Sequence, residues 1–175
     1  MVLWGYARCW LLPDTDGPRK IGSTTARERF APFAFTKWLS TGREIKALCA
    51  HDHSRELAST ADGSLTVWQD HIGLAFIMEP RGEFADQVAS EVRVGRLQYM
   101  SVGGLAFDDY IYEHDHLTGE RYRTVIESSV TEISIVARPA ALHTLVRAGE
   151  RLPLFMLSRR LDTLSLEDAD RGRHG

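Results

Sequence analysis

The chain is divided into short apolar runs of strand length, separated at close intervals by turn residues. These runs lie at 2–12, 45–50, 64–69, 74–79, 97–102, 110–112, 122–126 and 130–137. Short alternating runs bounded by Gly, Pro, Asn and Asp favour hairpins. Helical spacing or composition occurs in three further segments, at 24–38, 83–92 and 140–148. The pattern predicts an α+β domain whose mostly antiparallel sheet closes into a small barrel, with a few flanking helices.

Length and charge limit the number of domains and the kinds of partner. The 175 residues suffice for one hydrophobic core, and the net charge is −3. Nucleic acid is not expected as a partner, because phosphate binding needs a concentrated basic face. No apolar run approaches the ~18 residues of a membrane span, and the first residues lack the features of a secretory leader. We expect no membrane association and buried thiols at Cys9 and Cys49 in a reducing compartment.

The C-terminal part of the chain differs in composition from the rest. One apolar patch at 152–157 is followed by a charged end with few aromatic residues. Such a sequence cannot bury enough apolar surface to order itself. We therefore predict a compact domain over residues 1–148 and an extension over 149–175, the last part of which is a mobile tail.

A serine stands in the middle of the run at 95–107, and two glycines follow almost at once. Leu97, Tyr99 and Ser101 would share one face of an extended strand. Gly103 and Gly104 leave room for another backbone, such as that of a substrate peptide, to approach. The alternative interpretation is a serine in a core strand followed by a glycine bulge.

Two other polar residues stand where a core strand would carry apolar ones. These two residues are His51 and Glu132. A serine becomes a good nucleophile when a nearby base removes its proton, and the base works best when a third group holds its tautomer. Ser101, His51 and Glu132 could supply these three roles. Residue types alone do not establish a triad, because many chains of this length contain all three.

Several neighbours complicate the assignment of the base and the carboxylate. His53 would point to the same side as His51 in an extended chain, so it is the rival base. His51 could instead be a solvated turn histidine, and Glu132 could mark the wet face of a half-buried strand. Asp52 is expected to serve local structure, and Ser134 to support the site or face solvent rather than to react.

A metal site is the competing interpretation. The tripeptide His-Asp-His occurs at 51–53 and again at 114–116. Two histidines separated by one residue on a strand can chelate one metal ion. However, His114 and His116 fall at a predicted hairpin tip beside Gly119, where solvated side chains are the usual case.

The ordered set of motifs resembles the prohead proteases of tailed phages, which are related to the herpesvirus-type assembly proteases. The family's Gly-Tyr-Ala strand, Pro-Gly-Ala-Phe segment and His-Asp after a strand resemble 5–7, 32–35 and 51–52. Its Asp-x-x-Gly-Leu, Met-Ser-x-Gly and Glu-x-Ser-x-Val segments, with Pro-Ala after the last, resemble 70–74, 100–103, 132–136 and 139–140. The matches run in the family's order from residue 5 to residue 140.

The resemblance implies a serine endopeptidase with Ser101 as nucleophile, His51 as base and Glu132 as third member. It also implies that the substrates are scaffold segments and the precursor of the major capsid protein, cut inside an immature prohead in the host cytoplasm. Self-cleavage is implied as well, with the polar tail after about residue 157 as a target. No cofactor or metal is implied, and association into a homo-oligomer would suit the control of such an enzyme.

The sequence leaves two further points open. The oxyanion donors are backbone N–H groups either near Gly103–Gly104 or in the Ala137–Arg138 turn. An inactive capsid-assembly module with the same fold is a second alternative to the protease. The sequence departs from the family where Phe33 replaces a usual glycine, where Ala58 stands in place of a frequent glycine, and where Gly104 replaces a commoner aromatic residue.

Overall fold

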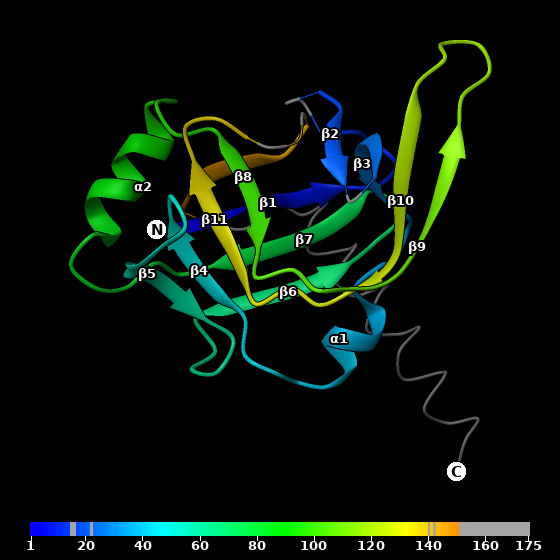
Figure 1. Ribbon diagram of the computed structural model, residues 1–175. Coiled ribbons are helices and arrows are strands. Elements are labelled where there is room, and N and C mark those ends of the chain that lie inside the picture. Colours follow the sequence, from blue (N-terminus) through cyan, green and yellow to red (C-terminus); the bar gives the residue numbers. More distant parts are fainter. Residues whose placement is uncertain (15–16, 22, 140, 142, 151–175) are drawn as a thin grey trace.

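A computed structural model gives the arrangement of residues 1–14, 17–21, 23–139, 141 and 143–150 (Figure 1). The strands of these described residues form three four-stranded sheets. The first sheet has the order β12 (Leu145–Gly149), β1 (Val2–Cys9), β7 (Gly73–Met78) and β6 (Leu65–Gln69). The second has the order β2 (Arg19–Ile21), β3 (Thr24–Phe30), β10 (Arg121–Ser128) and β9 (Phe107–His114). The third has the order β5 (Asp52–Ser59), β4 (Lys46–Cys49), β11 (Glu132–Val136) and β8 (Tyr99–Gly103).

Within the described part of the chain, two helices accompany the sheets, α1 (Thr36–Ser40) and α2 (Ala85–Arg93). Most strand pairs are antiparallel, and β3–β10 and β4–β11 are parallel. The α+β class and the mostly antiparallel pairing agree with the sequence prediction. No sheet of the described residues closes on itself, so the predicted barrel is not confirmed.

The hydrophobic core lies between the sheets and under α2. Ile133 and Ile135 of β11 and Met100 of β8 are fully buried on the core side of the third sheet. Helix α2 adds Val88 and Val92 on one face. Because side chains alternate along a strand, the residues between these apolar positions are directed to the opposite face of the sheet. This alternation determines where the polar residues of β8 and β11 lie.

Two segments differ from the predicted helices. Residues 24–30 form β3, because Ala26 and Phe30 are buried and the strand pairs with β10 in parallel. The helix of this region begins only at Thr36, beyond Pro32, which limits a helix that precedes it. The described part of 140–148 contains β12, whose Val146 pairs with Gly5 of β1. The apolar patch at 152–157 and the predicted tail lie outside the described residues.

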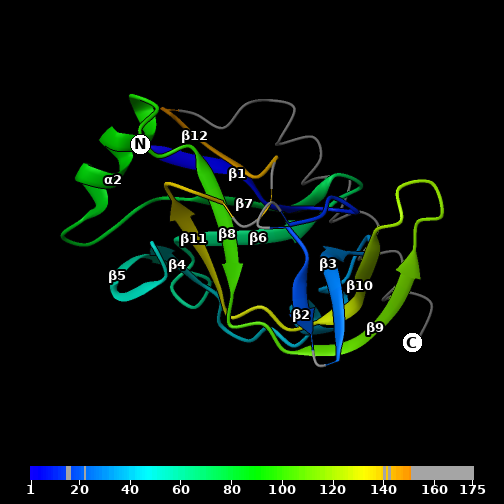
Figure 2. The same cartoon turned by 45° about the horizontal axis from the view of Figure 1, so that its top comes forward.

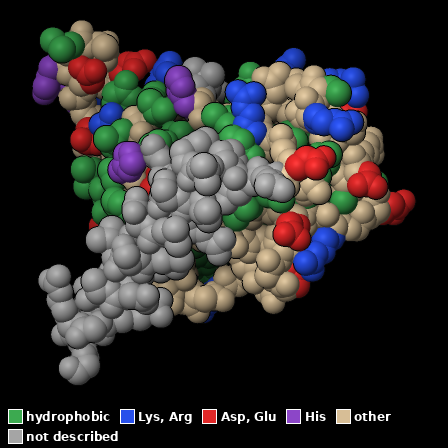
Figure 3. Space-filling view, turned by 180° about the vertical axis from the view of Figure 1, so that it is seen from behind, with side chains coloured by type: hydrophobic (Ala, Val, Ile, Leu, Met, Phe, Trp, Pro, Cys, Tyr) green, Lys and Arg blue, Asp and Glu red, His purple; other side chains and the backbone are tan. Residues whose placement is uncertain are grey.

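The remaining predicted elements are present with small shifts of their ends. The hairpins β6–β7 and β9–β10 form as predicted, and the latter extends away from the body at the end opposite α2 (Figures 1 and 2). On the face seen in Figure 3, Lys and Arg side chains are interspersed with Asp and Glu. Neither helix of the described residues has the length and apolar character that a membrane crossing needs.

Candidate active site

The outer face of the third sheet carries the polar residues of β8 and β11. Ser101 is the register partner of Ser134, and Gly103 is the partner of Glu132. Directly opposed residues of an antiparallel pair point to the same face, so all four share one face of the sheet. Ser101 is 8% exposed, Glu132 5% and Ser134 0%. A serine, a carboxylate and a second serine are thus buried together on the side away from the core.

His51 reaches this face from a two-residue turn between β4 and β5. Cys49 and Asp52 are register partners, so only Ala50 and His51 connect the strands. Both have positive φ, 56° and 62°, as a type I′ turn requires of its central residues. Such turns favour Asn and Gly, whereas non-glycine residues in this region cost about 1–3 kcal/mol each. His51 is therefore in a turn, as one of the two interpretations of the sequence has it. Its side chain, however, is not simply solvated.

The imidazole of His51 contacts the carboxylate of Glu132. His51 Nδ1 lies 2.6 Å from Glu132 Oε1, while the His51 side chain stays 44% exposed. A carboxylate at Nδ1 holds the proton there and leaves Nε2 as the free acceptor of the neutral ring. Lys46, the β4 register partner of Glu132, donates instead to Glu56 at 2.8 Å, which raises the pKa of Lys46. The Lys46 ammonium is therefore paired with Glu56 and not with Glu132.

Ser134 joins the same cluster from the middle of β11. Its hydroxyl donates to Glu132 Oε2 at 2.6 Å and accepts the backbone N–H of His51 at 3.2 Å. Of the two roles left open by the sequence, solvent-facing is excluded by the complete burial of Ser134.

The glycines after Ser101 are required by this packing. A Cβ atom added at Gly103 would lie 1.7 Å from Glu132 Oε1 and 3.3 Å from His51 Nδ1. The His51–Glu132 pair therefore occupies the space directly above Gly103. Gly104 has a φ of 61°, and an added Cβ would lie 1.7 Å from Thr131 Oγ1. The departure from the family's commoner aromatic residue at 104 thus accompanies a left-handed backbone that favours glycine.

Ser101 lies two residues before Gly103 on the same face, a step of about 6.6 Å along a strand. The described residues contain no hydrogen bond between Ser101 and His51. Catalytic hydrogen bonds are commonly long without substrate and tighten when it binds. The structure thus brings His51 and Glu132 into contact and leaves Ser101 on the adjoining part of the same face.

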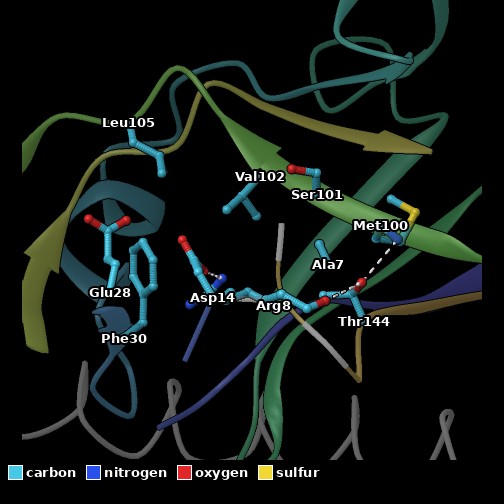
Figure 4. A pocket seen from close by; sticks show the side chains of 11 residues that line it. Ala7, Arg8, Asp14, Glu28, Phe30, Met100, Ser101, Val102, Leu105 and Thr144 are labelled. Atoms are coloured by element: carbon cyan, nitrogen blue, oxygen red, sulfur yellow. Dashed lines mark hydrogen bonds and ion pairs between the residues drawn. The ribbon is translucent and has the colours of Figure 1, made fainter. Parts of the chain in front are cut away.

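A cavity of about 110 Å³ runs beside β8, which is an edge strand of the third sheet (Figure 4). Ser101 and Val102 line one side of it, and Val102 points into the space. The opposite side carries the buried ion pair of Arg8 and Asp14, whose atoms Nη1 and Oδ1 are 2.6 Å apart. Ser101, the nucleophile candidate, therefore adjoins a hollow whose opposite side is charged.

The other candidates near residue 51 are not part of the cluster. His53 is exposed on β5 and makes no contact with Glu132 in the described structure. Asp52 accepts the hydroxyl and the backbone N–H of Ser54, which lowers the pKa of Asp52 and agrees with a local structural role. Burial raises the pKa of the Cys49 thiol, so this neighbour stays protonated and is a poor nucleophile.

The metal interpretation finds no support in the described residues. They contain no group of three or more His, Cys, Asp or Glu side chains that could hold an ion. The rings of His114 and His116 contact each other edge to face at the tip of the β9–β10 hairpin, with centroids 4.9 Å apart. Asp115 between them accepts the backbone N–H groups of Leu117 and Thr118, so it shapes the turn.

A model of the caudovirus prohead serine protease family matches residues 1–153. This range includes every residue of the cluster, and the chain belongs to that family. The family consists of serine proteases of capsid maturation in tailed phages. No curated protein sequence matches the chain.

Proposed function

We propose that the protein is a serine endopeptidase in which Ser101 is the nucleophile, His51 the general base and Glu132 the group that orients the base. The observation that carries the proposal is the 2.6 Å contact between His51 Nδ1 and Glu132 Oε1, on the face that bears Ser101. This contact is the base–orienter bond of a triad. The family match makes peptide hydrolysis the expected reaction.

In this mechanism Ser101 Oγ attacks the scissile carbonyl carbon while its proton passes to His51 Nε2. The carbonyl oxygen becomes an oxyanion, which needs preorganised N–H donors from Gly103–Gly104 or from the Ala137–Arg138 turn. His51 then gives its proton to the leaving amine, and the acyl-enzyme is hydrolysed by water that His51 activates. Glu132 offsets the positive charge that His51 carries between these steps.

The proposed substrates are scaffold segments and the precursor of the major capsid protein inside the assembling prohead in the host cytoplasm, with the protein's own C-terminal extension as a further target. The family supports this substrate class. The relation to herpesvirus-type proteases, the homo-oligomer and the absence of a cofactor, a membrane partner and a nucleic-acid partner stay predictions from the sequence.

Co-expression with the candidate capsid precursor tests the proposal. Intact mass should show a shortened precursor with wild type and a full-length precursor with Ser101→Ala. His51→Ala should behave as Ser101→Ala does, whereas the matched variant His53→Ala should cleave normally. Glu132→Ala should retain more activity, because the orienting member of a triad can contribute less than the other two.

The same experiment separates the alternatives. A full-length precursor with soluble, folded wild type would favour the inactive assembly module. An inactive His53→Ala beside an active His51→Ala would show that the base has been misassigned.

A further inference from the structure

Ser134 makes two hydrogen bonds around His51, one to the carboxylate beside its ring and one from its backbone. Its hydroxyl donates to Glu132 Oε2 at 2.6 Å, and Glu132 Oε1 contacts the His51 ring. The same oxygen accepts the backbone N–H of His51 at 3.2 Å. One fully buried side chain therefore touches both the carboxylate that faces the ring and the backbone that carries it.

The bond to Glu132 fixes which carboxylate oxygen faces His51. The terminal torsion of a glutamate is broad and roughly two-fold, so packing or hydrogen bonds must select its angle. With Oε2 held by Ser134, Oε1 is directed at Nδ1. Without the hydroxyl, a carboxylate that is only 5% exposed would lose one of its two donors, which is costly for a buried charge.

The bond from His51 N–H fixes the backbone of an unfavourable turn. Ala50 and His51 both have positive φ, and the backbone N–H of Ala50 is held by Ile135 O at 2.9 Å. The next N–H, that of His51, is held by the side chain of Ser134. Residues in this region of φ persist only where the surroundings determine their conformation. Ser134 thus supplies one of the two bonds from β11 that hold the turn.

We propose that Ser134 is a positioning residue of the protease, which holds the His51 ring over Gly103 through Glu132 and through the turn backbone at once. This inference rests on the proposed function of Ser101 and His51. The simpler interpretation is that Ser134 only satisfies buried polar groups and contributes to stability alone.

Ser59 offers a matched control for this distinction. Its hydroxyl also donates to a carboxylate at 2.6 Å, that of Glu44, and accepts a backbone N–H at 3.0 Å, that of Ala61. It is buried on β5 of the same sheet. The variants Ser134→Ala and Ser59→Ala therefore remove the same two kinds of hydrogen bond, one to a carboxylate and one from a backbone N–H. Only the bonds of Ser134 involve the surroundings of His51.

The first measurement is the reaction of Ser101 with a fluorophosphonate, which needs no knowledge of the cleavage site. Ser101 Oγ forms a bond to phosphorus, fluoride leaves and the serine proton passes to His51. Intact mass at several probe concentrations separates the limiting rate from the half-saturating concentration. We expect Ser134→Ala to lower the limiting rate about 10–100-fold and to change half-saturation less than about two-fold, because it misplaces the base and not the probe. Ser59→Ala should react at the wild-type rate.

The second measurement is the proton resonance of His51 Nδ1–H, identified by its loss in His51→Gln. We expect a low-field signal in wild type and Ser59→Ala that is shifted upfield or lost in Ser134→Ala. A wild-type rate and signal in Ser134→Ala, or equal losses of rate in both alanine variants, would overturn the positioning role. If wild-type Ser101 does not react at all, the proposed function fails, and the resonance alone then decides whether Ser134 positions His51.

Discussion

Residue 103 allows little beyond a hydrogen atom as its side chain, because the His51–Glu132 pair fills the space above it. Gly103→Ala would place a methyl group 1.7 Å from Glu132 Oε1, so the carboxylate must move and the imidazole with it. We expect the fluorophosphonate reaction at Ser101 to slow at least about 100-fold, since misplacement by 1 Å is enough for such a loss.

The control for Gly103→Ala is Gly63→Ala. Gly63 has a φ of 75° and open space around its Cβ position, so alanine there adds backbone strain without touching the site. Both variants should have lower melting temperatures than wild type, but Gly63→Ala should react at the wild-type rate. A normal rate in Gly103→Ala would show that the His51–Glu132 contact is not needed for reactivity.

Phe33 adopts a left-handed backbone at the place where the family usually has glycine. Its φ is 63°, and the residue is half-exposed beside Trp10, with ring centroids 6.4 Å apart. We expect the free energy of unfolding to be about 1 kcal/mol higher for Phe33→Gly than for Phe33→Ala. Phe33→Gly is the more stable variant because only glycine adopts this φ without strain. Urea denaturation measures the difference.

The corresponding pair at Lys37, an exposed position of α1, should show the opposite order. There alanine is favoured over glycine because the backbone is helical. If Phe33→Ala proves the more stable of its pair, the left-handed turn at 33 is not present in solution.

At the scale of elements, the sheet of β3, β10 and β9 contains a carboxylate whose charge is stabilised by its neighbours. Glu113 Oε2 accepts the hydroxyl of Thr124 and, at 3.0 Å, Nη2 of Arg29, and these bonds lower the pKa of Glu113. A lowered folded-state pKa adds stability above the ordinary carboxylate pKa, and this stability is lost as the pH falls through the lowered value.

We therefore expect the free energy of unfolding of wild type to fall more steeply than that of Glu113→Gln between about pH 5 and pH 3. Urea titrations at each pH give the two curves. Glu83→Gln removes an exposed carboxylate outside this sheet and should follow the wild-type curve. Parallel curves for wild type and Glu113→Gln would contradict the stabilisation.

The sequence predicts the hairpins well, because the signals of a hairpin are local. The turn between 69 and 74 and the alternation on either side are enough to place β6 and β7. The parallel pairs β3–β10 and β4–β11 join segments about 90 residues apart, and nothing local marks them. For the same reason β12, which pairs with β1 at the other end of the domain, has the appearance of a helix in the sequence.

The candidate site is predictable as residue types and not as geometry. The motifs around His51, Ser101 and Glu132 indicate which side chains are candidates for the site. Ser134 contacts both the carboxylate of Glu132 and the backbone of His51. These contacts depend on the register of β11 and on a turn with two positive φ angles. Alanine and histidine are unusual in such a turn, so local turn rules could not predict it.

At the scale of the whole molecule, the proposed base lies on a turn with two positive φ angles, while Glu132 and Ser101 lie on paired strands with a buried inner face. Strained, half-exposed turns open with a lower free energy than core strands. Heating should therefore break the contact between the His51 imidazole and Glu132 while the sheets are still intact. We expect the fluorophosphonate reactivity of Ser101 to disappear reversibly several degrees below the midpoint of the circular-dichroism transition, and coincident transitions would contradict this. Such an enzyme would lose its activity on warming before it unfolds, and cooling alone would restore the activity.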